Sequence, residues 1–238
     1  MVTLQLTTAL ILALLLQLGG LTFVVLRDPY ISSDNRQYLL GSIFLTFLLL
    51  IQNQMENYVP QMTTGTFWVT LVAFLGYTLR PAIIALFTQI VREDWRSWIF
   101  VGLNAAVNSL SFATHLVFWY TPDLSFHRGP LGYTTHVIGF LMLLLLIRNV
   151  VKKYRETKQS LFLPTVIVLS LVAATVADSV LSFSPPISYL TVAIVSGCVF
   201  FYIWLHQQFV REHEDELRAE QRIRIMISQI RPHFLFNT

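Results

Sequence analysis

The sequence predicts an all-α membrane protein, in which a seven-helix transmembrane bundle is followed by a cytoplasmic helix. Two features of its composition support this fold class. Hydrophobic residues make up 55% of the chain and charged residues only 12%, whereas a typical globular chain is about a quarter charged. The mean hydropathy is +0.61. These values exclude an ordinary soluble domain and indicate a chain that crosses a lipid membrane several times.

Seven apolar runs are long enough to cross a membrane, which takes about 20 mostly apolar residues. The run at the N-terminus lacks the basic start of a signal peptide, so we expect it to be a retained span. Cys198 is the only cysteine, lies in the seventh run and is expected simply to pack there. The seven expected spans cover residues 4–26, 39–59, 66–90, 97–120, 130–150, 161–181 and 187–206.

Basic residues predict the orientation of these spans. All but two of the 16 Lys and Arg residues fall on one side if the N-terminus lies outside. The exceptions are Arg128, in an outer loop, and Arg80, within the third span. Basic loops stay in the cytoplasm, so the sequence predicts an outer N-terminus and a cytoplasmic C-terminus. The pI of about 9.1 is thereby explained without a nucleic-acid partner, and none is expected.

A charged segment follows the seventh span. Residues Gln207 to Ile230 contain no Gly or Pro and are rich in Glu, Arg and Gln, so we expect one helix that continues the span. Heptad positions in it are only partly apolar, which makes the coiled-coil signal weak and a solvated surface helix equally compatible. The expected organisation is therefore a membrane domain at 1–206, a helical linker at 207–228 and a terminal segment at 229–238.

The terminal segment is the most specific motif in the chain. It reads Gln229-Ile230-Arg231-Pro232-His233-Phe234-Leu235-Phe236-Asn237-Thr238. This string resembles the phospho-acceptor segment of LytS-type sensor histidine kinases. Residues 1–206 more loosely resemble the seven-span region that precedes some bacterial histidine kinases. That second resemblance rests on Glu56, Arg80-Pro81, Asn104 through Trp119, and Gly129-Pro130.

The resemblance implies a membrane sensor of a two-component system, in the cytoplasmic membrane of a bacterium. His233 would be the phospho-acceptor, since neutral imidazole is the attacking group. Asn237 shares its helix face and would contact the phosphoryl group or the response regulator. Pro232 favours a bend or a first helical turn before His233. A homodimer, ATP and Mg²⁺ are implied for the complete kinase. The ATP-binding domain is not in these residues, so no cofactor and no activity are expected of this fragment alone.

Polar residues inside the expected spans are the candidate ligand-binding residues, because such groups are costly in hydrocarbon. Asn104, Asn108 and His115 are expected to form one polar stripe with Ser111 on the fourth span. At ~1.5 Å rise per residue, Arg80 is expected at a depth in the membrane close to that of Gln52 or Asn53. The remaining candidates, expected in an outer pocket, are Glu56, His136 and Asp178. Any one of these residues could instead form a structural contact between helices, with its polar group satisfied by a neighbour. No metal site is expected, because no third ligand accompanies His115 and His136.

Two other function classes fit parts of the chain. A transporter or channel, or a non-catalytic seven-span receptor, would explain the polar stripe but not the terminal motif. A retinal photoreceptor is excluded, because all three lysines lie in one loop at positions 152–158 and none lies within a span. The stimulus cannot be identified from the residues.

Overall fold

The computed structural model describes residues 2–62, 65–157, 162–180 and 188–235. Seven α-helices, a single 3-10 turn and one β-hairpin lie in these ranges. Their bounds are α1 Val2–Arg27, α2 Ser33–Met62, α3 Thr66–Val91, α4 Arg96–Ser109, η1 Leu110–Phe112, β1 Phe118–Tyr120, β2 Phe126–Arg128, α5 Thr134–Thr157, α6 Phe162–Val180 and α7 Tyr189–Leu235.

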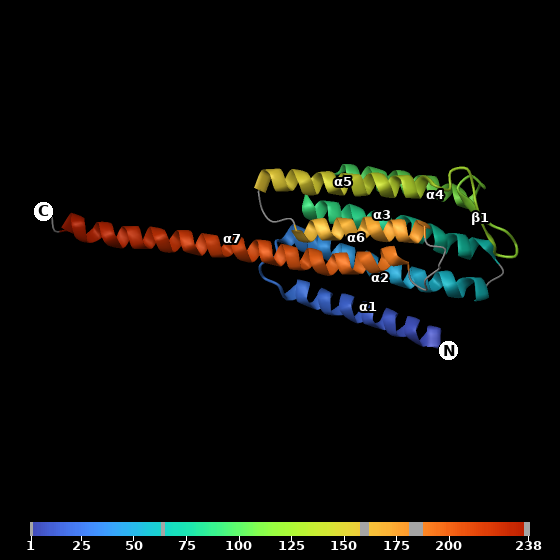
Figure 1. Cartoon of the computed structure of the whole chain (residues 1–238), viewed down its shortest axis with the longest axis horizontal. Helices are drawn as coiled ribbons and strands as arrows, with labels where there is room; N and C mark the ends of the chain where they lie inside the picture. Colours follow the sequence, from blue (N-terminus) through green and yellow to red (C-terminus); the bar gives the residue numbers. More distant parts are fainter. Residues whose placement is uncertain (1, 63–64, 158–161, 181–187, 236–238) are drawn as a thin grey trace.

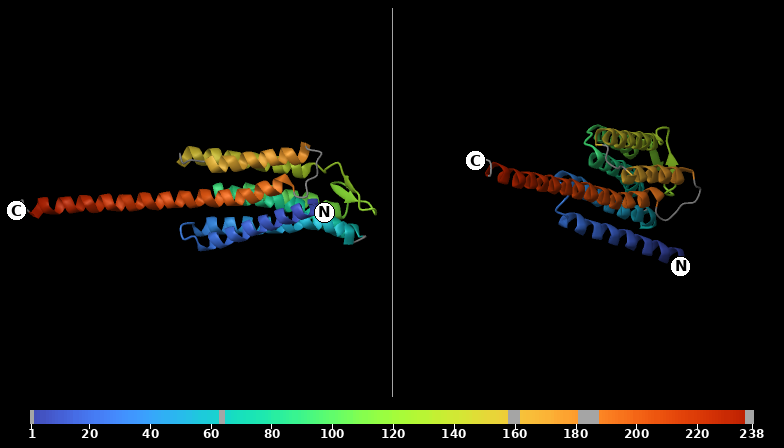
Figure 2. Two further views of the ribbon diagram at one scale, coloured as in Figure 1. Left: turned by 60° about the horizontal axis from the view of Figure 1, so that its bottom comes forward. Right: turned by 60° about the vertical axis from the view of Figure 1, so that its left-hand side comes forward.

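The helices lie side by side along one long axis, and the two ends of this bundle differ (Figure 1). The N-terminus and the β-hairpin lie at one end. The C-terminal part of α7 projects far beyond the opposite end. Figure 2 shows the same projection from two other directions, with α1 at the edge of the bundle. We call the two ends the hairpin end and the α7 end.

An apolar core joins α2, α3, α5, α6 and α7. The rings of Phe87 and Phe201 meet at its centre, with centroids 4.7 Å apart, and neither residue is exposed to solvent. Cys198 is fully buried, as expected, with its sulfur 3.6 Å from the Thr46 hydroxyl. Helix α1 contributes only one stripe, because its buried residues recur at helical spacing: Leu14, Leu18, Leu21 and Val25.

Five of the helices are long and apolar enough to cross a membrane: α1, α2, α3, α5 and α7. Helix α6 has a shorter apolar stretch, Phe162–Asp178. Helix α4 has only 14 residues, or ~21 Å of helix, which is less than the ~30 Å of a hydrocarbon core. Five of the seven expected spans are therefore helices that could cross a membrane, judged by length and composition.

The expected span at 97–120 is wrong in its second half. The helix ends at Ser109, and after the 3-10 turn the strand Phe118–Tyr120 pairs antiparallel with Phe126–Arg128. An apolar run of this length does not by itself distinguish helix from strand, and aromatic residues favour strands. Gly129 closes the hairpin, because its N–H donates to the Val117 carbonyl at 2.8 Å. A Cβ there would lie 2.3 Å from the Leu116 carbonyl oxygen. The chain is thus mostly helical, not all-α.

Helix α7 is a single helix of 47 residues, ~70 Å long. It contains the expected seventh span from Tyr189 onward and the whole of the expected linker helix Gln207–Ile230. It also continues through Pro232 to Leu235, so no new helix starts at Pro232. His233 therefore lies on the same helix as the buried residues of the bundle.

Candidate functional site

Three helices are joined by one asparagine side chain. The Asn53 carbonyl oxygen, on α2, accepts a hydrogen bond from the Arg80 guanidinium on α3 at 3.3 Å. The Asn53 amide donates to the Thr191 hydroxyl on α7 at 3.0 Å. Arg80 also donates to the Gly76 carbonyl oxygen of its own helix at 3.1 Å. The expected proximity of Arg80 to Asn53 is thus observed, and Asn53 links Arg80 directly to α7.

Asn104 compensates for a proline in the neighbouring helix. Pro81 lies inside α3 and has no N–H, so it cannot donate to the carbonyl of Tyr77, four residues earlier. The Asn104 amide of α4 donates to that carbonyl oxygen at 2.8 Å, and Asn104 is completely buried. In membrane helices a freed carbonyl must find another donor. Asn104 therefore acts as a structural contact between α3 and α4.

The next residue of the expected stripe joins α4 to α5. The Asn108 amide donates to the Thr135 hydroxyl at 2.9 Å and to the Asn104 backbone carbonyl at 2.8 Å. Ser111 is also buried, so the inward face expected for Asn104, Asn108 and Ser111 is confirmed. His115 does not share it, because the helix has ended and its side chain is exposed.

Glu56 is held by Gln52, one turn earlier on α2. The Gln52 amide donates to a Glu56 carboxylate oxygen at 2.6 Å and to the Val72 backbone carbonyl at 3.0 Å. Gln52 fits only because Gly76 of α3 has no side chain: a Cβ there would lie 2.5 Å from the Gln52 amide nitrogen. The close approach of α2 and α3 therefore sets the position of Glu56.

Gly76→Ala is expected to lower the free energy of unfolding by about 1–3 kcal/mol, the usual range for overpacking a filled site. The new methyl group must push Gln52 out of its two hydrogen bonds. Chemical unfolding in detergent micelles, followed by far-UV circular dichroism, measures the effect. Gly102→Ala on α4 is the matched control, because a Cβ there meets nothing within 4 Å. Equal stability of the two variants would contradict the prediction.

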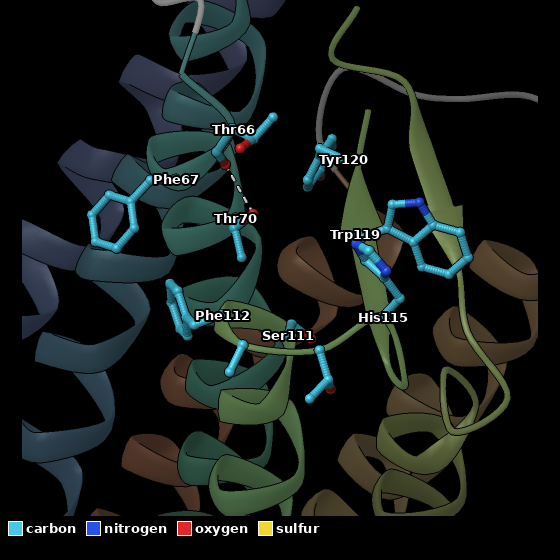
Figure 3. Close-up of a pocket in the computed structure, with 10 residues that line it drawn as sticks. Thr66, Phe67, Thr70, Ser111, Phe112, His115, Trp119 and Tyr120 are labelled. Carbon is cyan, nitrogen blue, oxygen red and sulfur yellow. Dashed lines mark hydrogen bonds between the residues drawn. The ribbon is translucent and has the colours of Figure 1, made fainter. Parts of the chain in front are cut away.

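Two cavities open at the hairpin end and share Tyr120. One, of about 340 Å³, is bounded by α2, α3 and the hairpin and has Glu56 in its wall. The other, of about 230 Å³, lies between the start of α3 and strand β1. Figure 3 shows Thr66 and Thr70 on one side of this second cavity, His115, Trp119 and Tyr120 on the other, and Ser111 between them. We call them the Glu56 cavity and the hydroxyl cavity.

The sequence analysis expected the outer candidate residues in one pocket, but the structure does not bring them together. Glu56 and His115 line different cavities. His136 starts α5 beside Tyr133, with ring centroids 6.0 Å apart. Asp178 of α6 accepts hydrogen bonds from the Ser188 hydroxyl at 2.6 Å and the Leu190 N–H at 3.0 Å. Asp178 thus caps the beginning of α7, a place where a carboxylate is stabilising.

A second polar cluster, at the α7 end, was not recognised in the sequence. The buried carboxylate of Asp28 lies 2.7 Å from the ring nitrogen Nδ1 of His206, on α7. It also accepts the Tyr30 N–H at 2.9 Å. Burial opposes ionisation of this carboxyl, but the hydrogen bonds from Tyr30 and His206 outweigh it and hold the pKa of Asp28 below its usual range. The α1–α2 loop is thereby fastened to α7 where that helix leaves the bundle.

The terminal motif is only partly within the described residues. The backbone at His233 is helical, and Asn237 lies outside the described ranges. Within the part of the chain that the structure describes, no three His, Cys, Asp or Glu side chains are grouped closely enough to hold a metal ion.

Comparison with known proteins adds no family to this geometry. No protein-family model matches the sequence, and no curated protein matches it either.

Proposed function

We propose that this chain is the membrane sensor part of a two-component histidine kinase. A stimulus read by the transmembrane bundle would control autophosphorylation of His233 and phosphotransfer to a response regulator. The observation that carries the proposal is the unbroken helix α7, which contains both the buried Thr191 and His233. The sequence motif gives His233 its chemical role, and α7 gives the bundle a direct mechanical connection to it.

The direction of successive helices supports the expected seven-span topology with the N-terminus outside, in which the crossing by α4 is shorter than the hydrocarbon core. Each of the helices α1 to α7 begins at one end of the bundle and finishes towards the other (Figure 1). The segments at the α7 end contain Arg27, Arg92, Arg96 and Lys153. Because basic segments are retained in the cytoplasm, the projecting part of α7 would lie in the cytoplasm together with ATP.

Two contacts would transmit a change in the bundle to α7. The first is the Asn53–Thr191 hydrogen bond, which ties the start of α7 to α2 and, through Asn53, to Arg80. The second is the Asp28–His206 pair at the point where α7 leaves the bundle. A shift or rotation of α2 relative to α7 has to strain or break these contacts. The projecting helix would then change its position as one rod.

The projecting part of α7 also suits a homodimer. Its apolar side chains Ile223 and Met226 are three residues apart and are 55% and 60% exposed. A helix in water that exposes such residues on one face is commonly covered by a second helix. The occupant we propose is α7 of a second copy, which would place two His233 residues side by side.

Phosphorylation of His233 is the direct test. The full-length gene product that carries this sequence would be reconstituted in proteoliposomes with Mg²⁺ and radiolabelled ATP. We expect acid-labile, base-stable labelling that His233→Ala abolishes. His127→Ala is the matched control and should be labelled normally, because His127 lies exposed in the hairpin at the other end of the bundle.

Labelling that persists in His233→Ala would contradict the assignment of the phospho-acceptor. A full-length protein with no label at all would contradict the kinase proposal and favour a non-catalytic receptor.

A further inference from the structure

The Glu56 cavity contains one charged group and several aromatic rings. Its volume of about 340 Å³ is in the range of small-molecule sites in proteins. Helix α2 supplies the carboxylate, α3 supplies the floor and the β-hairpin supplies the outer wall. The lining residues are Met55, Glu56, Val59, Tyr77, Tyr120 and Phe126, with smaller apolar side chains between them.

The carboxylate of Glu56 is fixed in position but has no cation as a partner among the residues that the structure describes. Gln52 holds one of its oxygens at 2.6 Å and is itself held against α3. Glu56 is exposed to the cavity. Among the described residues, no Lys, Arg or His lies within ion-pair distance of it. A negative charge beside the apolar part of a membrane protein attracts a positive one strongly, because the local dielectric constant is low.

Aromatic rings complete the surroundings of this charge. Tyr120 and Phe126 face each other across the hairpin edge to face, with centroids 5.6 Å apart. Tyr77 approaches from α3, and its ring centroid is 5.3 Å from that of Phe118. Rings of this kind attract cations through their negative faces, and methylated ammonium groups are the ligands that such groups of rings commonly bind.

Arg128 is an internal cation that contacts two of the rings lining this cavity, Tyr77 and Phe126. Its guanidinium carbon lies 4.7 Å from the centroid of the Tyr133 ring and 5.9 Å from that of Phe126. Its aliphatic chain is locked by Gly132, where a Cβ would lie 2.1 Å from the Arg128 Cγ. Arg128 thus contacts Tyr133 and two of the lining rings, but among the described residues it forms no ion pair with Glu56, whose carboxylate can accept an external cation.

We propose that the Glu56 cavity binds a small organic cation with an ammonium head group. Glu56 is the counter-ion, and Tyr77, Tyr120 and Phe126 contact the carbon atoms around the nitrogen. The hydroxyl cavity shares Tyr120 but has no carboxylate in its wall, so it does not offer this chemistry. A role of the cation as the stimulus rests on the proposed function. In that case Gln52 and Asn53, which are neighbours on α2, would connect the cavity to Arg80 and Thr191.

Choline and its neutral isostere 3,3-dimethyl-1-butanol test the proposal, because they have nearly the same shape and differ in charge. Isothermal titration of the full chain in detergent micelles measures both. We expect choline to bind at least about tenfold more tightly than the alcohol, and Glu56→Gln to remove that difference. Tyr120→Leu should weaken choline binding while leaving the carboxylate in place. Glu93→Gln is the matched control, since Glu93 is exposed in the α3–α4 loop at the other end of the bundle.

Equal binding of the two probes, no choline binding up to roughly 10 mM, or an unchanged affinity in Glu56→Gln would each overturn the proposal. Circular dichroism of every variant shows whether it is folded. The measurement does not involve His233, so a failure of cation binding is distinguishable from a failure of the kinase proposal.

Discussion

Replacing Asn53 with leucine is expected to lower the free energy of unfolding by about 3 kcal/mol. The substitution removes two hydrogen bonds, one to a charged group and one to a neutral group. Asn53 is only 5% exposed and is the shared partner of Arg80 and Thr191. Leucine fills a similar volume but cannot accept from the guanidinium or donate to the hydroxyl. Arg80 would then keep only the Gly76 carbonyl as its acceptor among the contacts of the described residues.

Unfolding by a denaturing detergent in mixed micelles, followed by circular dichroism, measures the loss. Thr191→Val removes only the α7 half of the contact and should cost about 1 kcal/mol. Thr88→Val is the matched control, because Thr88 is equally buried but its hydroxyl donates to Ile84 within its own helix at 2.9 Å. If Asn53→Leu is no more destabilising than Thr88→Val, the contact between α2, α3 and α7 contributes nothing to stability.

The depth of Arg80 could be predicted from the sequence because the rise of an α-helix is constant. Counting residues along two adjacent spans is enough to place Arg80 beside Gln52 or Asn53. The third partner, Thr191, could not be found in this way. It lies 138 residues from Asn53, and only the packing of α7 against α2 brings the two together. Threonine in an apolar run gives no signal of its own, since its hydroxyl usually bonds within its own helix.

The hairpin was missed for a different reason. Residues 116–120 form a short apolar run after His115, and a run of that length fits a helix and a buried strand equally well. The strand Phe118–Tyr120 is stabilised by contacts far from it in sequence, with the ring of Phe118 against Tyr77 of α3. As a result, the position expected for His115 on a helical stripe was wrong, although the same periodicity correctly placed Asn104 and Asn108.

The role of Asp178 shows the same limit of sequence reasoning. A lone acidic residue in an apolar helix indicates either a binding site or a structural contact. The decision depends on what faces it, and here the backbone N–H of Leu190 and the Ser188 hydroxyl do. Those two groups belong to the beginning of the next helix, which no helical periodicity of α6 reveals.

Asn104→Leu is expected to destabilise the protein by about 1–3 kcal/mol, the cost of leaving a buried polar group unpaired. The unpaired group would be the Tyr77 carbonyl. Pro81 has no N–H to donate to it, and Asn104 donates to it at 2.8 Å instead. The loss should depend on the proline. In a Pro81→Ala background, the N–H of residue 81 can donate to the same carbonyl as in any regular helix. Asn104→Leu should then cost at least about 1 kcal/mol less.

The four proteins of this double-mutant cycle would be compared by unfolding in the same mixed micelles. Thr135→Val is a useful control, because it removes a partner of Asn108 on the same inward face but has no connection to Pro81. Its cost should be the same with and without the proline. If Asn104→Leu also costs the same in both backgrounds, Asn104 does not compensate for Pro81. A coupling confined to Asn104 would establish that this part of the polar stripe stabilises a proline-containing helix, and would leave Glu56 and Tyr120 as the better candidates for contact with a ligand.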